Sequence, residues 1–271
     1  MARANPSLLA GLLLGGVILA LALISLVYTP HDPARMAILT RLSPPSTRFW
    51  LGTDPFGRDI ASMLMVGARN ALLIGCVSVG LGMVIGTVLG LFAASRAGSL
   101  VDEVMMRLCD FLFAFPAILT VILIVSVFGP GFGKAMLAIG LFNIPIFARL
   151  AYKAGAQVLA RDFIKAARLA GVKPARILLR HVLPNIAGLL LVQASIQCAG
   201  AILAEAGLSY LGLGVPPPNP SWGRMLNDAQ TFLGIAPMLA VLPGVMIALS
   251  VLAFTLLGDG LRDALDPRGR A

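Results

Sequence analysis

Hydrophobic residues gather in long runs along this chain, and polar residues collect in the segments between them. A helix needs roughly 20 mainly apolar residues to cross a hydrocarbon core of about 30 Å. Six runs approach or exceed this length: residues 8–27, 71–95, 105–128, 135–152, 186–207 and 237–257. The pattern predicts an all-α integral membrane protein with about six transmembrane helices.

The composition agrees with a membrane protein. The chain is 58% hydrophobic and only 12% charged, whereas an ordinary soluble domain has about 25% charged residues. Most of its helices must therefore be hydrophobic on all sides. The first run follows Arg3, as in a secretory signal, but it exceeds the usual length of about 7–15 residues and no Ala-x-Ala site follows it. We therefore expect a retained helix.

Lysine and arginine are divided unequally between the segments that join the runs. If the amino terminus is cytoplasmic, fourteen of the 21 fall on the cytoplasmic side and seven on the outer side. Five of the outer ones precede residue 70, where Asp32, Asp54 and Asp59 partly offset them. The positive-inside rule thus favours two cytoplasmic termini. The net charge of +9 lies on membrane flanks and not on one soluble face, so we expect no nucleic-acid partner.

Groups that could carry out chemistry are scarce. The only two histidines, His31 and His181, lie in different segments, which excludes a metal cluster or a His-based triad built within the chain. Cys76, Cys109 and Cys198 all fall in apolar runs, so we expect packing residues without disulfides. The sequence predicts no catalytic residue, no metal site and no enzyme activity.

Two glycine-containing motifs fail as functional sites. GPGFGKA, residues 129–135, has Ala135 where a phosphate-binding loop needs Ser or Thr. GLSYLG, residues 207–212, lacks the second glycine of a nucleophile elbow, and Ser209 has no nearby base. We interpret both as turns.

Two acidic residues fall inside the apolar runs, where a charge costs about 2.5–3.5 kcal/mol at a helix centre. Asp110 follows Arg107 by one helical turn, so we expect an ion pair between them. Glu205 lies near the outer end of its run, where water or a neighbouring subunit could satisfy it. Two peripheral acids make a poor proton relay, which counts against a secondary transporter.

Glycine recurs every fourth residue in GMVIGTVLG, at Gly82, Gly86 and Gly90. This spacing puts all three on one helix face. The stripe predicts the close approach of another helix.

The most basic stretch is DFIKAARLAGVKPARILLRHVLPN, residues 162–185. Asp162 is expected to cap a short helix with an apolar side, and Gly171 to end it in a left-handed turn. Pro174 suits the start of a second short helix, and Pro184 the bend into the next span. The apolar side of the first helix comprises Phe163, Ala166, Ala167 and Ala170. One interpretation is a basic anchor on anionic lipid.

The spacing of this stretch supports a different interpretation. Lys165-Ala166-Ala167, Gly171 and Leu183-Pro184 resemble the cytoplasmic coupling loop of ABC importer permeases, with His181 at the first position of the closing group. In that family the pattern is Glu-Ala-Ala, three residues, Gly, nine residues, a hydrophobic residue, any residue and Leu-Pro. Lys165 replaces the glutamate, which removes any role for an acid at that position.

Further stretches resemble the second permease of dipeptide, oligopeptide and nickel importers. They are LGTDPFGRDIASMLMVGARNAL (51–72), MRLCDFLFAFPAIL (106–119), EAGLSYLGLGVPPPNPSWGRML (205–226) and LLGDGLRDALDPR (256–268). Thr255 stands where the family often has Asn. The resemblance implies a type I ABC importer permease fold, with a helix and outer loop in residues 1–70 and a permease core in 71–271. The coupling loop would be residues 160–184.

The resemblance also implies function and partners. The chain would form half of a translocation pathway for peptides, with nickel or another metal chelate as the alternative cargo. Its partners would be a homologous permease, two cytoplasmic ATPases that bind ATP and Mg²⁺, an extracytoplasmic binding protein and the lipid of a bacterial inner membrane. The chain itself would bind no cofactor. The residues that contact the ATPases would be Asp162, Lys165, Ala166, Ala167, Gly171, His181, Leu183 and Pro184.

Two outer segments carry further predictions. Loop 208–236 is too polar and irregular to face lipid, so it should be buried in protein or lie at the water boundary. We expect it to dip toward the translocation path or to meet the binding protein, with Glu205, Ser209 and Trp222 as the candidates for contact. A plain connecting loop is the alternative interpretation. In residues 51–60, we expect Asp54, Arg58 and Asp59 to form a local salt-bridged turn.

Overall fold

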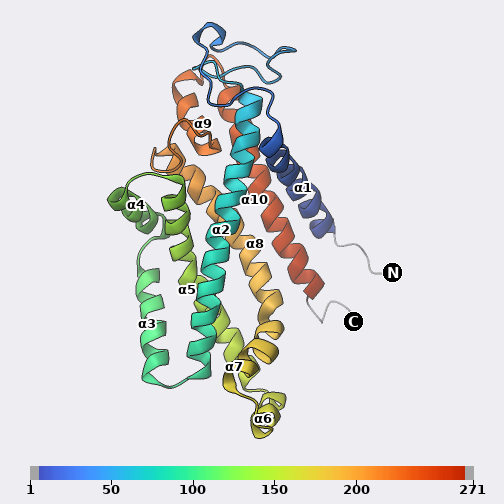
Figure 1. Ribbon diagram of the computed structural model, residues 1–271, viewed down its shortest axis with the longest axis vertical. Helices are drawn as coiled ribbons and strands as arrows, with labels where there is room; N and C mark the ends of the chain where they lie inside the picture. The colour runs from blue at the N-terminus through green and yellow to red at the C-terminus, as the bar shows by residue number, and fades with distance from the viewer. Residues whose placement is uncertain (1–5, 266–271) are drawn as a thin grey trace.

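A computed structural model describes residues 6–265 of the chain, and its ribbon is an elongated helical bundle (Figure 1). The long helices are α1 (Pro6–Val27), α2 (Ile60–Ser95), α3 (Leu100–Ala114), α4 (Ala117–Phe128), α5 (Phe132–Leu159), α8 (Leu183–Tyr210) and α10 (Met238–Leu265). The short helical segments are η1 (Ile38–Thr40), α6 (Asp162–Leu169), α7 (Pro174–Ile177), η2 (Leu178–Val182), α9 (Trp222–Ala229) and η3 (Gln230–Phe232).

Membrane spans occur where the hydrophobic pattern predicts them, with one break. In residues 6–265, five helices are long and apolar enough to cross a membrane: α1, α2, α5, the joined helix Pro174–Tyr210, and α10. A sixth span arises if α3 and α4 are counted together, although they are bent by 89°. The predicted continuous helix over 105–128 is therefore wrong. Pro116 explains the break, because proline forces the preceding Phe115 into extended backbone (φ −92°, ψ 135°).

Helix α2 starts eleven residues earlier than predicted, at Ile60 and not at residue 71. The Asp59 side chain caps it by accepting a hydrogen bond from the Ser62 backbone N–H at 3.0 Å. Only Ser62, Arg69 and Asn70 are polar in residues 60–70, so the apolar run could have been extended back to Ile60.

The added turns of α2 are buried under loops 28–59 and 208–236, which lie at the end of the bundle that we call the outer end. The His31 N–H donates to Ser62 Oγ at 2.9 Å, and Asn70 Nδ2 donates to the Pro220 carbonyl at 2.9 Å.

The core of the bundle is the pair α2 and α5, which lie side by side along much of their length (Figure 1). A Cβ added at Gly86 or Gly90 would press against the carbonyl oxygens of Ile144 and Ala148. Gly82 approaches Asn143 equally closely. The predicted packing role of the glycine stripe is confirmed, since the α5 backbone occupies the space that side chains would need.

Both ends of the described chain lie at the same end of the α1–α10 pair, because the two helices pack side by side and the start of α1 meets the end of α10. A Cβ at Gly260 would come within 2.6 Å of Leu8, near the start of α1. The loop 28–59 lies at the opposite end of these helices (Figure 1). Arg3, Arg268 and Arg270, which contribute to the charge asymmetry, lie outside the described residues.

Candidate functional site

Helix α6 lies at the extreme end of the molecule, remote from α9 and the outer loops (Figure 1). Arg161 occupies its capping position, and Asp162 is the first helical residue. The predicted capping role of Asp162 is therefore wrong. Its carboxylate instead accepts a hydrogen bond from Lys165 Nζ at 2.9 Å, one turn later. A negative charge at the amino terminus of a helix also stabilises the helix dipole.

The apolar side of α6 is only partly covered by the rest of the chain. Ile164, which sequence reasoning missed as a contact, is fully buried, and Ala167 is half-buried. Phe163, Ala166 and Ala170, predicted on the same side, are exposed. The helix is thus anchored by Ile164 and leaves a surface of one aromatic ring and two alanines uncovered within the described residues.

Gly171 ends α6 in the left-handed conformation that the sequence predicts, with φ +77°. The Val172 N–H donates to the Ala167 carbonyl at 3.1 Å, and the Gly171 N–H donates to the Arg168 carbonyl at 3.0 Å. These bonds satisfy carbonyls that the helix end leaves free. A Cβ at Gly171 would meet no described heavy atom within 4 Å, so the turn faces open space.

The second short helix is not separate from the span that follows it. Residues Pro174–Tyr210 form one helix of 37 residues, and the predicted bend at Pro184 is wrong. A π-helical turn, Leu178–Val182, precedes the proline, and the Leu183 N–H donates to the Leu178 carbonyl. A proline ring clashes with the carbonyl four residues earlier in a regular α-helix. The wider π turn accommodates Pro184 without a break, and it contains His181.

Basic side chains surround this region. All six of its lysines and arginines are exposed, namely Arg161, Lys165, Arg168, Lys173, Arg176 and Arg180. The salt bridge from Lys165 to Asp162 is between highly exposed groups and contributes little. The surface around α6 therefore combines uncovered small apolar residues with a positive rim.

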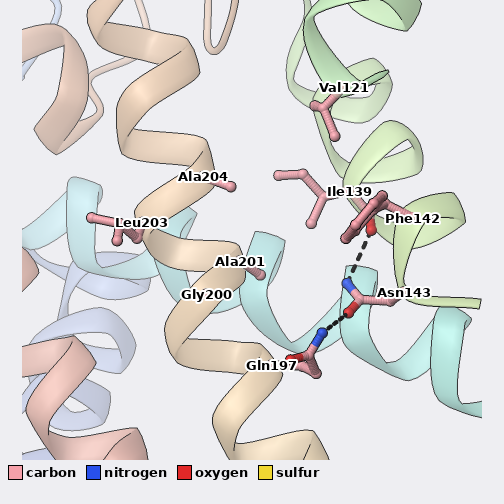
Figure 2. A pocket seen from close by; sticks show the side chains of 9 residues that line it. All are labelled: Val121, Ile139, Phe142, Asn143, Gln197, Gly200, Ala201, Leu203 and Ala204. Carbon is pink, nitrogen blue, oxygen red and sulfur yellow. Dashed lines mark hydrogen bonds between the residues drawn. The ribbon is translucent and has the colours of Figure 1, made fainter. Parts of the chain in front are cut away.

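A pocket of about 290 Å³ lies between α4, α5 and α8 (Figure 2). Gln197 Nε2 donates to Asn143 Oδ1 at 2.6 Å, and Asn143 Nδ2 donates to the Ile139 carbonyl at 2.9 Å. The lining residues are Val121, Ile139, Phe142, Asn143, Gln197, Gly200, Ala201, Leu203 and Ala204. Sequence reasoning named no residue of this pocket, although Asn and Gln within apolar runs were a visible signal.

Glu205, Ser209 and Trp222 are brought together at the outer end of α8, and each is only 1% exposed. Ser209 Oγ donates to Glu205 Oε1 at 2.6 Å and accepts from the Val215 N–H at 3.1 Å. The Trp222 indole donates to the Leu64 carbonyl at 3.1 Å. These contacts hold loop 208–236 against α2 and α8, and contact with substrate or binding protein stays a prediction.

The predicted salt-bridged turn before α2 is confirmed for Asp54 and Arg58, whose side chains pair at 2.6 Å. Asp59 instead caps α2 and approaches His31 Nδ1 at 3.6 Å. Sequence reasoning missed Asp228 of α9, which pairs with Arg58 at 2.9 Å. The turn is therefore part of a longer network between the two outer loops.

Asp110 does not pair with Arg107, as its spacing suggested. It pairs with Arg149 of α5, and Arg107 pairs with Glu103 at 2.6 Å. Helix α5 packs beside α3 and brings Arg149 to Asp110. Asp110 therefore pairs with a residue that is distant in sequence and not with Arg107 on its own helix. Cys76, Cys109 and Cys198 are free thiols.

Most of this chain matches known membrane transport proteins in sequence. Residues 86–271 match the family model of the binding-protein-dependent transport system inner membrane component. The chain is 43% identical to a glutathione transport system permease protein, GsiD, of Pectobacterium atrosepticum, over 93% of this chain and 84% of the relative. It is 40% identical to the dipeptide permease DppC of Alkalihalophilus pseudofirmus (98% and 87%) and 43% identical to the di/tripeptide permease DppC of Pseudomonas aeruginosa (97% and 89%).

Solved structures agree on the fold. The inward-facing MetNI methionine ABC transporter matches with a TM-score of 0.60 at 19% identity, covering 74% of this chain and 94% of the matched chain. A second crystal form gives a TM-score of 0.61. This chain therefore belongs to the binding-protein-dependent transport system inner membrane components, as a multi-pass permease subunit of an ABC importer and not an enzyme.

Proposed function

We propose that this chain forms half of the translocation pathway of an ATP-driven importer of peptides. Its partners are a homologous second permease, an extracytoplasmic binding protein and two cytoplasmic ATPases that bind ATP and Mg²⁺. Both chain ends and α6 lie on the cytoplasmic side of a bacterial inner membrane. The predicted boundary at residue 70 falls inside α2, so we place it before Ile60: residues 1–59 form an accessory helix and outer loop, and the permease core begins with α2.

The uncovered face of α6 is the observation that carries this proposal. Phe163, Ala166 and Ala170 are exposed, and the space beside Gly171 is open. Small residues around one aromatic ring allow a partner surface to approach closely. Within the same turn, Ile164 is fully buried in the core. A partner that displaces the exposed face of α6 would therefore also displace the core residues packed against Ile164.

In this mechanism the helix Pro174–Tyr210 transmits movement from α6 to the rest of the bundle. It runs from beside α6 to the outer end of the molecule without a break. When the ATPases close on ATP, movement of α6 would be transmitted along α8 to the pocket and the outer loops. Shifting a two-state equilibrium from 1:99 to 99:1 takes about 5.5 kcal/mol of differential binding. A continuous helix can couple this binding free energy to a movement of the bundle, whereas a flexible joint would allow α6 to move without the bundle.

Peptides are the proposed cargo because the curated relatives are permeases of dipeptide, di/tripeptide and glutathione systems. No group of three or more His, Cys, Asp or Glu within residues 6–265 could hold a metal ion. A naked metal ion would therefore find no cluster of ligands in the described chain, while a metal chelate would not need one.

Uptake by the assembled transporter tests the proposal. The chain would be co-purified with its partner subunits and placed in liposomes with the binding protein outside and ATP inside. Uptake of labelled dialanine and glutathione would then be measured, with nickel–histidine as the competing cargo. We expect uptake of at least one peptide that requires both ATP and the binding protein. Uptake of the nickel chelate alone, or uptake without ATP, would contradict the proposal.

A further inference from the structure

Asn143 and Gln197 lie near the middle of two membrane-spanning helices, α5 and α8. An amide at this depth is costly unless it is hydrogen-bonded, because lipid offers it no partner. The two side chains meet at 2.6 Å across the helix interface, and the contact joins positions 54 residues apart. Figure 2 shows the pair at one end of the pocket. The presence of two amide side chains at this depth therefore indicates a structural or functional role.

The two amides keep unused hydrogen-bonding capacity. Each side-chain NH₂ group has two hydrogens, and the contacts described for it use one: Gln197 to Asn143, and Asn143 to the Ile139 carbonyl. Gln193 Nε2 donates to Gln197 Oε1 at 3.4 Å, and that oxygen has a second lone pair. The pair can thus donate and accept further bonds from a molecule in the pocket.

The wall beside the pair consists of small residues. Gly200, Ala201 and Ala204 follow Gln197 along α8 and line the pocket. A Cβ at Gly200 would meet no described heavy atom within 4 Å, and the residue is exposed. The volume of about 290 Å³ is near the lower end of the roughly 300–1,000 Å³ of complete ligand pockets.

Charge is absent from the residues that line this pocket. A passage must bind its cargo well enough to admit it and weakly enough to release it. Neutral amides meet that requirement for a peptide main chain, because they offer donors and acceptors that complement N–H and C=O groups. They also make no distinction between acidic and basic side chains.

We propose that the pocket between α4, α5 and α8 is a segment of the translocation path, in which Asn143 and Gln197 hydrogen-bond the main-chain amide groups of a passing peptide. The inference rests on the proposed function and adds the place and chemistry of the contact. The competing role is a structural clamp between α5 and α8, in a pocket that opens only to lipid.

Thiol reactivity separates a water-filled path from a lipid-facing pocket. In a variant with Cys76, Cys109 and Cys198 replaced by alanine, Gly200→Cys places a thiol in the pocket. Gly16→Cys is the matched control, since Gly16 also lies mid-helix, in α1, and has no described heavy atom within 4 Å of its Cβ. Both variants, assembled with all partner subunits in vesicles, are treated with a water-soluble, charged methanethiosulfonate.

We expect G200C to react at least 10-fold faster than G16C when ATP and binding protein are cycling, and dialanine or glutathione to slow its reaction at least 3-fold. A rate ratio near one overturns the inference, and so does fast labelling that neither peptide slows. Failure of the proposed function has a different signature: the cysteine-free parent then imports neither peptide. The ratio between the two thiols still decides whether the pocket belongs to a water path.

Gln197→Leu tests the amide itself, with Ser195→Ala as its control, because Ser195 lies on the same helix, outside the pocket lining, and faces Gly258 of α10. We expect Gln197→Leu to lower the number of peptides imported per ATP hydrolysed by about 10-fold, while Ser195→Ala leaves that ratio unchanged. A clamp role predicts a different result for Gln197→Leu, namely lower thermal stability with an unchanged ratio. That result would overturn the assignment of the pair to peptide contact.

Discussion

Arg58, in the turn before α2, pairs with Asp228 of α9 at 2.9 Å across 170 residues of sequence. Both side chains are nearly inaccessible, at 7% and 11% exposed, and Arg58 also pairs with Asp54 at 2.6 Å. Arg224 binds the other oxygen of Asp228 at 3.1 Å. The network joins the first outer loop to the second and fixes both over the ends of α2 and α8.

Replacing Arg58 with methionine should therefore destabilise the outer region. Removing one partner of a buried ion pair leaves uncompensated charge and costs about 3–5 kcal/mol. Thermal unfolding of the detergent-solubilised transporter, followed by size-exclusion chromatography, is the measurement. Arg107→Met is the control, because its pair with Glu103 is largely exposed and is worth about 0.5 kcal/mol or less. Equal losses in the two variants would contradict this account of the outer network.

Gly90→Ala should weaken the packing of α2 on α5. The added methyl group would meet the Ala148 carbonyl and the Ala151 side chain, and overpacking of this kind costs about 1–3 kcal/mol. Gly80→Ala is the matched control on the same helix, since its Cβ would meet no described heavy atom within 4 Å. We expect a lower midpoint of thermal unfolding for Gly90→Ala only. A similar decrease for Gly80→Ala would show that helix flexibility, and not close approach, requires glycine.

Ser209→Ala should loosen the outer end of α8. The hydroxyl bridges Glu205 Oε1 and the Val215 N–H, and all three residues are buried. Loss of the bridge leaves a buried carboxyl group and a buried N–H without this partner, at a cost of about 1–3 kcal/mol. Protease cleavage within loop 208–236 should become faster in intact vesicles. Cleavage at the wild-type rate would show that the loop is held by other contacts.

Local sequence signals predict most of the spans and the turn at Gly171 well, because hydropathy and backbone conformation are local properties. Long apolar runs mark α1, α5, α8 and α10, and Gly171 adopts the left-handed turn expected of it. Pro116 is a local signal too, and the break between α3 and α4 follows from its effect on Phe115.

Partners of polar groups are harder to predict, because tertiary structure decides between candidates of equal chemistry. Asp110 is one turn from Arg107 in sequence, yet the bundle gives it Arg149. Asp228 lies far from Arg58 in the chain and gives no local indication of the pair. The pocket around Asn143 and Gln197 could not be predicted for the same reason, because the two residues meet only when α5 and α8 pack together.

Gly171→Val should uncouple ATP hydrolysis from uptake while leaving the chain inserted in the membrane. The substitution forces a β-branched residue into a positive φ and places bulk in the open space beside α6. Gly98→Val is the matched control, because Gly98 also has a positive φ, +83°, and open space, in the turn between α2 and α3. We expect at least a 10-fold loss of peptide uptake for Gly171→Val only. Equal losses would attribute the effect to backbone strain alone.

The most direct test of the central claim is a photo-crosslink from the exposed face of α6. A benzophenone amino acid would be placed at Ala166, and at Trp50 in the outer loop as a control, since both positions are exposed. Irradiation of the transporter in its native membrane should join position 166, and not position 50, to an ATP-hydrolysing subunit, with a yield that changes when nucleotide is bound. Adducts from position 166 with lipid alone would contradict the assignment of α6 as the docking site of the ATPase.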